Sequence, residues 1–268
     1  MTLTECREKR GWESNQEIID ILEKMQLRIR KRIPDGEFKL TKLQQLAIDT
    51  PEFWRDWKNE ESQNLMIQGA TSAGKTLLAE LAIMDTLAHD RRSAIILVPL
   101  KSMVNERRKQ FDHDMTPYFR VYAASSDYME YDERLIKGDY DVAIIVYEKF
   151  FAMLSQGNRQ IMKNCGLLVV DELAMLSKEQ RGPKLELALE IVRRNHVDTR
   201  IMCLATNDCS SDKICRWLNI DENHRIFSAA RPVALEEHIL LLNGKGSYRT
   251  IPADCEELMI ANNQEVKE

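Results

Sequence analysis

The sequence lacks the features that mark several classes of protein. Its 268 residues contain only 10 glycines and 7 prolines, which excludes a collagen-like chain. With 44% hydrophobic and 30% charged residues, it also differs from a disordered chain. No apolar run approaches the roughly 18–20 residues that cross a bilayer, and residues 1–16 lack the apolar core of a secretory signal. We therefore expect a globular protein that is not embedded in a membrane.

An excess of basic charge is also missing, because the formal net charge is −5. Any binding of nucleic acid must therefore come from a local surface rather than from the charge of the whole chain. The pattern of residues 16–32 predicts an amphipathic helix whose last part carries Arg28, Arg30, Lys31 and Arg32. These cations suit the negative end of a helix and the solvent. The alternative is a contact with nucleic acid.

The six cysteines include no C-x2-C pair, and no two histidines follow them at zinc-finger spacing. Cys203, Cys209 and Cys215 recur every six residues, which leaves a metal site as an alternative. We expect them instead to be small, partly buried side chains in a reducing environment. The expected location is the cytoplasm, or the nucleus in a eukaryote.

From residue 40 onward, short apolar runs alternate with stretches of helical periodicity. The runs are apolar throughout, as in parallel strands that are covered on both faces. This alternation predicts a doubly wound α/β domain with a mainly parallel sheet, whose sites gather at the carboxyl ends of the strands. The predicted strands are residues 64–68, 94–98, 120–123, 142–146, 167–170 and 200–204, and the predicted helices include 75–87, 102–111 and 183–194.

The first of these strands leads into the pattern G-x-x-x-x-G-K-T, the P-loop of nucleotide-binding proteins, and a predicted helix follows it. Small residues let successive backbone N–H groups wrap an anion, and the helix directs its positive end at the phosphates. Lys75 would reach the β- and γ-phosphates, and the Thr76 hydroxyl would bind Mg²⁺. The expected nucleotide contacts in this loop are Gly69, Ala70, Thr71, Ser72, Ala73, Gly74, Lys75 and Thr76.

The strand predicted at residues 167–170 ends in two acids, Asp171 and Glu172. Charges at the tip of a buried strand are costly unless they serve a cation or a site. We expect Asp171 to hold Mg²⁺ together with Thr76, and Glu172 to orient the attacking water, so that both acids and Lys75 are catalytic. The acid pair favours ATP hydrolysis, since the N-K-x-D pattern of guanine recognition is absent. A nucleotide kinase is a less favoured alternative, because the sequence shows no lid with clustered arginines.

Further motifs resemble, in chain order, those of the superfamily 2 helicases, in particular the superkiller-like group that includes the archaeal DNA-repair helicases. The resemblance spans residues 38–242 and implies the first of two RecA-like motor domains. Residues 1–37 would then be an N-terminal helical extension, and residues 243–268 a tail leading toward an absent second motor domain. The matching segments outside the P-loop and the acid pair are residues 40–48, 98–106, 125–128, 146–150, 180–186, 204–206, 214–219 and 231–233.

The resemblance also implies roles for single residues. Gln44 would read the adenine base, for which its amide offers both a donor and an acceptor. Ala205 and Thr206 would couple ATP hydrolysis to strand movement. The implied contacts with nucleic acid are Pro99, Lys101, Tyr147 and Lys149. By contrast, we expect residues 107–109, which are Arg, Arg and Lys, to form a solvated helix face.

Three positions depart from the family pattern. Ala174 stands where the D-E-x-H motif of the family has histidine, so a polar bridge toward the 204–206 segment is missing. Leu204 and Val146 replace residues that carry hydroxyl groups. Binding of Mg²⁺ and hydrolysis should survive these changes, whereas the coupling to nucleic acid is left open.

The predicted function is that of an ATP-dependent helicase or translocase, present as its N-terminal ATP-binding motor domain. Residues 125–128 and 180–186 are closer to the DNA-repair branch of the family, so single-stranded DNA is favoured over RNA. Alone, the domain would hydrolyse ATP weakly, because a second RecA-like domain supplies the arginine fingers. The alternative is a non-catalytic ATP-binding scaffold or regulatory module, which Ala174 and Leu204 favour and the intact Lys75 opposes.

Overall fold

The computed structural model describes residues 10–12, 15–31, 39–56, 63–88, 92–207, 209, 211–233, 238–242 and 248–252. The chain divides into two compact units, Met1–Ala230 and Arg231–Glu268. Arg32, the last residue of the first predicted helix, and residues 243–247 and 253–268 of the predicted tail lie outside the described residues. The predicted domain limits at residues 37 and 242 stay predictions.

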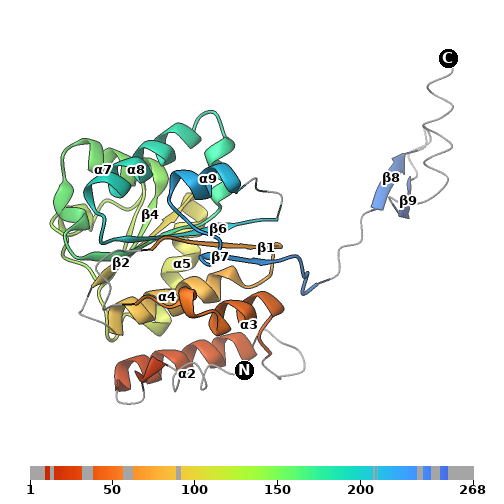
Figure 1. The fold of residues 1–268 in the computed structure, drawn as a ribbon, viewed down its shortest axis with the longest axis horizontal. Coiled ribbons are helices and arrows are strands. Elements are labelled where there is room, and N and C mark those ends of the chain that lie inside the picture. Colours follow the sequence, from red (N-terminus) through yellow and green to blue (C-terminus); the bar gives the residue numbers. More distant parts are fainter. Residues whose placement is uncertain are drawn as a thin grey trace. The chain divides into compact units, whose positions relative to one another are not determined.

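A sheet of seven parallel strands forms the centre of the first unit (Figure 1). Its order is β3-β4-β2-β5-β6-β1-β7. The strands are β1 (Leu65–Gly69), β2 (Ser93–Val98), β3 (Val121–Ala124), β4 (Val142–Val146), β5 (Cys165–Val170), β6 (Arg200–Ala205) and β7 (Arg225–Ser228). Six of them lie within two residues of a predicted strand. The predicted α/β class with a parallel sheet is therefore confirmed.

Helices cover both faces of this sheet (Figure 1). On one face lie α2 (Gln16–Arg30), α3 (Lys42–Asp49), α4 (Lys75–Ala88) and α5 (Lys101–Asp114), and on the other α7 (Tyr147–Ser155), α8 (Gly182–Asn195) and α9 (Asp212–Trp217). Shorter pieces are α6 (Asp132–Ile136) and the 3₁₀ helices η2 (Pro51–Phe53), η3 (Arg159–Met162) and η4 (Leu173–Ser177). Each face has its own cluster of buried apolar side chains, so the sheet is the middle of three layers.

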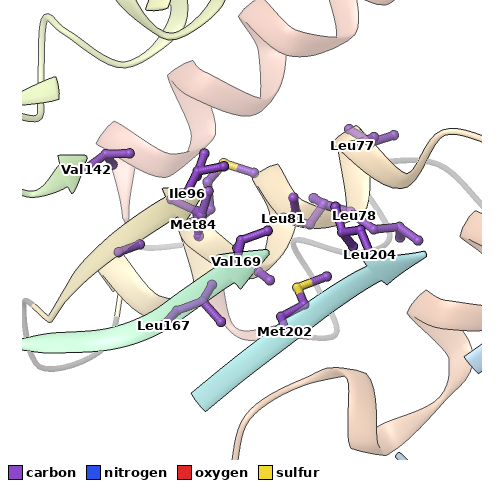
Figure 2. Packing of buried hydrophobic residues seen from close by; sticks show 14 of the residues in the cluster. Leu77, Leu78, Leu81, Met84, Ile96, Val142, Leu167, Val169, Met202 and Leu204 are labelled. Carbon is purple, nitrogen blue, oxygen red and sulfur yellow. The ribbon is translucent and has the colours of Figure 1, made fainter. Parts of the chain in front are cut away.

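The central strands are apolar at every position except their first residues Ser93 and Arg200, because both of their faces are covered. In β2, β4, β5 and β6, every residue is buried, and successive side chains of a strand point to opposite faces. Leu78 and Met84 of α4 belong to the same buried cluster as Val169 of β5 (Figure 2). Burying one such side chain stabilises the fold by about 1.5–3 kcal/mol. This packing fixes α4, and with it the loop that precedes the helix.

Helix α2 is attached to the domain by ion pairs as well as by apolar contacts. Arg28 Nη2 lies 2.8 Å from a Glu80 carboxylate oxygen, and Arg28 Nε lies 2.8 Å from Asp114 Oδ2. The Arg28 side chain is only 15% exposed. The prediction of a solvent-facing cation at this position is therefore wrong, because the acids that hold Arg28 are on α4 and α5, far away in the sequence. Arg30 and Lys31 are exposed.

The sequence did not indicate the last three strands. Strand β7 has only four residues and is not apolar throughout, since one side of it is an edge of the sheet. In the second unit, β8 (His238–Leu242) and β9 (Tyr248–Pro252) form an antiparallel pair, where we expected the end of a domain and a tail. Among the helices that the structure describes, none combines the length and the apolar character of a membrane span.

Candidate functional site

The strand order brings the predicted nucleotide residues to one edge of the sheet. Strand β6 lies between β1 and β5, and all three run in the same direction. The loop after β1, the acid pair after β5 and the segment after β6 therefore meet at the carboxyl ends of neighbouring strands. This is the place where ligands bind in open α/β sheets.

The P-loop at residues 69–76, called the phosphate loop from here on, has the backbone conformation that its small residues permit. Gly74 has a φ of +83°, a left-handed conformation that favours glycine, and Ser72 also has a positive φ of 66°. Helix α4 begins directly afterwards at Lys75, so its first N–H groups and its positive end face the loop. In this conformation Lys75 Nζ donates to the carbonyl oxygens of Gly69 and Ala70, at 2.8 and 2.9 Å. The loop thus forms a compact turn closed by its own lysine.

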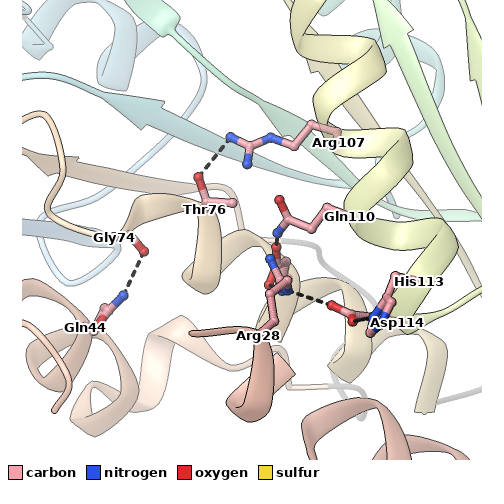
Figure 3. A network of polar contacts seen from close by, with 9 residues as sticks. Arg28, Gln44, Gly74, Thr76, Arg107, Gln110, His113 and Asp114 are labelled. Carbon is pink, nitrogen blue, oxygen red and sulfur yellow. Dashed lines mark hydrogen bonds and ion pairs between the residues drawn. The ribbon is translucent and has the colours of Figure 1, made fainter. Parts of the chain in front are cut away.

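Thr76 and Asp171, the two predicted Mg²⁺ ligands, are brought together by a third residue. Arg107 Nη2 donates to Thr76 Oγ1 at 2.8 Å (Figure 3). The same nitrogen donates to Asp171 Oδ2 at 3.0 Å. The Arg107 side chain is 14% exposed. The prediction that Arg107 belongs to a solvated helix face is wrong, because α5 packs against the sheet and directs this side chain toward the end of β5. Lys109 is exposed, as predicted.

The acid pair is held by backbone as well as side-chain contacts. The Asp171 N–H donates to the Leu97 carbonyl at 3.0 Å, and the Asp171 carbonyl accepts from the Tyr147 hydroxyl. Glu172 has φ 56° and ψ 56°, a left-handed conformation that costs a non-glycine residue about 1–3 kcal/mol. Its side chain is exposed. The turn therefore keeps Asp171 against the sheet and presents Glu172 at the surface of the site.

Gln44 lies against the phosphate loop, where its amide is bound on both ends. Its Oε1 accepts from the Thr41 N–H at 2.9 Å, and its Nε2 donates to the Gly74 carbonyl at 3.1 Å (Figure 3). The Thr41 hydroxyl caps α3 and donates to the Ala73 carbonyl at 2.7 Å. Gln44 is 6% exposed. It connects α3 to the loop, and its reading of adenine stays a prediction.

Two of the four predicted nucleic-acid contacts have buried side chains. Tyr147 is 0% exposed, and its hydroxyl is bound to the Asp171 carbonyl. Burial, together with the nearby acids, raises the pKa of this hydroxyl well above its ordinary value, so it stays a donor. Pro99 is buried too. These two side chains have little surface to offer a ligand, so a contact of Pro99 or Tyr147 with nucleic acid would have to use backbone atoms, and it stays a prediction.

The two predicted lysine contacts already have acidic partners. Lys149 Nζ lies 2.7 Å from Asp132 Oδ2 and donates to the Ser125 carbonyl at 2.9 Å, which fastens the segment after β3. Lys101, at the start of α5, lies 2.8 Å from Asp127 Oδ1, with both side chains more than half exposed. Of the four residues, only Lys101 has a largely exposed side chain, so a contact through Lys101 stays a prediction.

Arg181 is a residue of the site region to which the sequence assigned no role. Its Nη1 donates to the Pro99 carbonyl at 2.6 Å, and its Nε lies 3.2 Å from Glu148 Oε1. It therefore joins the segments after β2 and β4. The next residue, Gly182, begins α8, where an added Cβ would lie 2.1 Å from the Leu176 carbonyl. The match of residues 180–186 to the family was the available signal, but only the structure shows these contacts.

The segment after β6 is tied to β1 by one side chain. Gln68 Nε2 donates to the carbonyls of Thr206 and Cys209, at 3.1 and 2.9 Å, and Gln68 Oε1 accepts from the Ser211 hydroxyl at 3.0 Å. Ala205 is buried at the end of β6, and Thr206 is partly buried. This arrangement connects the predicted coupling residues to the strand that leads into the phosphate loop.

The cysteines near this segment show no sign of a metal centre. Burial raises the pKa of the Cys203 and Cys215 thiols, which favours the neutral form over the thiolate that binds metals. Within the part of the chain that the structure describes, no cluster of three or more Cys, His, Asp or Glu residues is arranged to hold a metal ion.

The chain is similar to known proteins over the region that carries this site. A model of the DEAD/DEAH box helicase family matches residues 41–214. The ATP-dependent DNA helicase Hel308 of Thermoplasma volcanium is 31% identical over 208 residues, which cover 78% of this chain and 29% of the relative. That of Pyrococcus horikoshii is 33% identical over 180 residues, which cover 67% and 24% of the two chains. The chain therefore spans less than a third of the length of these relatives.

Proposed function

Because the chain belongs to the DEAD/DEAH box helicase family, we propose that it is the ATP-binding motor domain of an ATP-dependent DNA helicase. The observation that carries the proposal is the meeting of Thr76 and Asp171 beside the phosphate loop, at the carboxyl ends of β1 and β5. The family model covers both residues. A second RecA-like domain is the partner that we propose to close this site from the other side.

In the proposed reaction, the phosphates of ATP bind to the loop at residues 69–76. Its N–H groups and the start of α4 attract the anion. Lys75 now donates to two carbonyl oxygens of its own loop. Hydrogen bonds from an ammonium to an anion are stronger than those to a neutral carbonyl. We therefore expect Lys75 to turn from Gly69 and Ala70 to the β- and γ-phosphates, where its charge stabilises the negative charge of the leaving ADP.

The oxygens of Thr76 and Asp171 suit Mg²⁺, a hard cation that prefers oxygen ligands. Both lie within hydrogen-bond distance of the same Arg107 nitrogen, so a single cation can contact both. Held by these two residues, Mg²⁺ would supply positive charge to neutralise the phosphoryl oxygens. Glu172 is exposed one residue after Asp171, and in the proposal its carboxylate orients the attacking water.

DNA is the proposed nucleic acid because the similar proteins are named as DNA helicases. On this chain, the exposed Lys101 at the start of α5 is the proposed phosphate contact. Arg181 holds the neighbouring segment through Pro99. We propose that it acts by positioning, since its guanidinium is bound to a carbonyl and to Glu148.

A non-catalytic scaffold is a second candidate, which one feature of the site favours. Ala174 lies in η4, directly after the acid pair, and has no polar atom that could reach the segment after β6. Leu204, which is 1% exposed, has an apolar side chain and supplies no polar atom either. In a scaffold, ATP would set a conformation without being hydrolysed. The two candidates therefore differ in turnover and not in ATP binding.

The experiment that tests the proposal measures ATP turnover by this chain with no nucleic acid, with single-stranded DNA and with single-stranded RNA of the same sequence. Lys75→Ala is the blank. We expect slow turnover above the blank that DNA stimulates more than RNA. If RNA stimulates ATP turnover more than DNA does, RNA and not DNA is the substrate. Binding of ATP without turnover in all three conditions, even after a second RecA-like domain is added, would favour the scaffold.

A further inference from the structure

The position of Arg107 is not explained by the proposed function. A single nitrogen of its guanidinium contacts both oxygens that are proposed to hold Mg²⁺, Thr76 Oγ1 and Asp171 Oδ2. The Arg107 and Asp171 side chains are 14% and 11% exposed, so water screens their attraction only in part. Arginine does not lose its proton in proteins. The proposed metal position is therefore next to a permanent cation that belongs to the protein.

The contacts of α5 single out Arg107 from the neighbouring cations. Arg108 lies over the rings of Tyr128 and Tyr131, at 5.2 and 5.7 Å from their centroids. Lys109 is exposed. Gln110, three residues after Arg107 and on the same side of the helix, donates to Glu80 of α4 (Figure 3). The polar side chains of residues 107 and 110 thus lie on the side of α5 that faces α4.

We propose that Arg107 is the internal counter-ion of the metal site. In the structure Arg107 neutralises Asp171 and holds it beside Thr76, and it has to withdraw from these oxygens for Mg²⁺ to bind to them. This inference rests on the proposed function, since it concerns the regulation of the same Mg²⁺ site. Two cations cannot contact the same two oxygens from the same position. Arg107 therefore competes with Mg²⁺ and limits how much the metal adds to nucleotide affinity.

An acid on α4 lies next to the place that Arg107 would leave. Glu80 lines the same small cavity as Arg107, Thr76 and Asp171, and this cavity has room for about one water molecule, so Arg107 can turn toward Glu80 only if neighbouring side chains also shift. Glu80 is 2% exposed and lies one helical turn after Thr76 on α4. Burial raises the pKa of Glu80 overall, against the charges of Arg28 and Arg107, which lower it. A guanidinium that turns from Asp171 toward Glu80 would add to the positive charge that favours the carboxylate form of Glu80.

This movement would also connect the metal site with the N-terminal helix. Arg28 of α2 donates to Glu80 Oε2 at 2.8 Å and lies equally close to Asp114 of α5 (Figure 3). Glu80 would receive a second arginine when Arg107 turns. The alternative role for Arg107 is a direct contact with a phosphate. Its removal would then weaken nucleotide binding equally with and without the metal.

The test compares nucleotide affinity with and without the metal. A fluorescent ADP analogue is titrated into the full chain in excess Mg²⁺ and again in EDTA. The dissociation constant in EDTA divided by that in Mg²⁺ gives the contribution of the metal to affinity. The variants are Arg107→Gln and the matched control Lys109→Gln, which removes an exposed charge two residues away on the same helix. A ratio of this kind cancels any general loss of affinity.

We expect the ratio to rise about tenfold in Arg107→Gln, as for the loss of one competing ion pair, and to keep its wild-type value in Lys109→Gln. An unchanged or smaller ratio in Arg107→Gln would overturn the inference while leaving the proposed function intact. Failure of the wild-type chain to bind ADP in either buffer would instead sink the proposed function, and this inference with it.

A measurement on the wild-type chain covers the case in which Arg107→Gln does not fold. The NMR signal of the Arg107 Nε–H group, assigned through its loss in Arg107→Lys, should shift when Mg²⁺ is added to the ADP-bound chain. The same signal should stay in place when ADP is added in EDTA. A signal that does not respond to Mg²⁺ would contradict the withdrawal of Arg107.

Discussion

At the scale of single residues, the phosphate loop depends on a close fit between Gly74 and Gln44. Gly74 has a φ of +83°, and an added Cβ would lie 2.0 Å from Gln44 Nε2. A side chain at this position would therefore be strained and would also displace Gln44. Because Gln44 connects Thr41 of α3 to the loop, its displacement changes the position of the phosphate-binding N–H groups.

Gly74→Ala should therefore reduce both stability and ATP binding. Gly157 is a matched control, since it has a similar φ of +82° but no atom within 4 Å of an added Cβ. Gly157→Ala should cost about 1–2 kcal/mol, the price of the left-handed backbone alone. Unfolding in urea should show a larger loss for Gly74→Ala, and a titration with ATP should show weakened binding in that variant alone. Equal effects of the two changes would contradict the role given to Gln44.

The acid pair permits a second prediction at this scale. Glu172→Gln should keep its affinity for ATP in Mg²⁺, because the proposed Mg²⁺ ligands are Thr76 and Asp171. Turnover should fall by about 10²–10⁴-fold, the usual contribution of a positioned acid or base. Asp171→Asn is the control and should lose affinity in Mg²⁺ but not in EDTA. Undiminished turnover in Glu172→Gln would show that the water is activated elsewhere.

The residues that could be predicted are those in contiguous motifs. Lys75, Thr76 and Asp171 could be predicted to share one site, because each lies at a fixed place in a short pattern next to a strand. The contacts of Arg107 and Tyr147 could not be predicted, because their partners at the end of β5 lie 64 and 24 residues away in the sequence. Nothing in the sequence around them reports those contacts.

At the scale of elements, α8 and α9 are joined by Glu190, whose contacts the helical pattern of the sequence does not predict. Glu190 of α8 accepts from Trp217 Nε1 of α9 at 2.9 Å and pairs with Arg193. The hydrogen bond from Arg193, with those from Trp217 and Arg194, lowers the pKa of Glu190 to about 2. The unfolded chain therefore binds this proton more readily than the folded one. The stabilisation is present above the ordinary pKa of 4.5 and is lost as the pH falls through about 2.

Glu190→Gln should consequently be less stable than the wild type at pH 7, and the difference should shrink as the pH falls below 4.5. Thermal unfolding at a series of pH values measures this difference. Glu186→Gln is the control, since Glu186 is exposed on the same helix. A difference that is constant from pH 7 to about 3 would mean that the charge of Glu190 does not hold α9.

Which elements were predictable follows from their burial. The runs in β2, β4, β5 and β6 are apolar because both faces of these strands are covered, so their composition alone identifies them. Strand β7 lies at the edge of the sheet, and its short pattern resembles a loop. Arg28 shows the same limit in a helix, because its burial depends on where α2 packs and not on the periodicity of α2 itself.

At the scale of the whole molecule, the strand order explains why segments far apart in the sequence form one site. Since β1, β6 and β5 are neighbours and parallel, the loop at residues 69–76, the acids at 171–172 and the segment at 205–206 share one edge. The family resemblance predicted the fold but not this contact geometry. Arg107 contacts Asp171 at that edge. One turn further along α5, Gln110 contacts Glu80, which also accepts from Arg28 of α2, so α2 is joined to the helices that carry the site.

The central claim is that this edge of the sheet is a site for ATP with Mg²⁺. The most direct test is an equilibrium titration of a fluorescent ATP analogue into the wild-type chain and into Lys75→Ala, both in excess Mg²⁺ and with folding checked by circular dichroism. We predict saturable binding by the wild type and no measurable binding by Lys75→Ala. Equal affinities of the two folded chains would contradict the assignment of the phosphate loop and, with it, the proposed function.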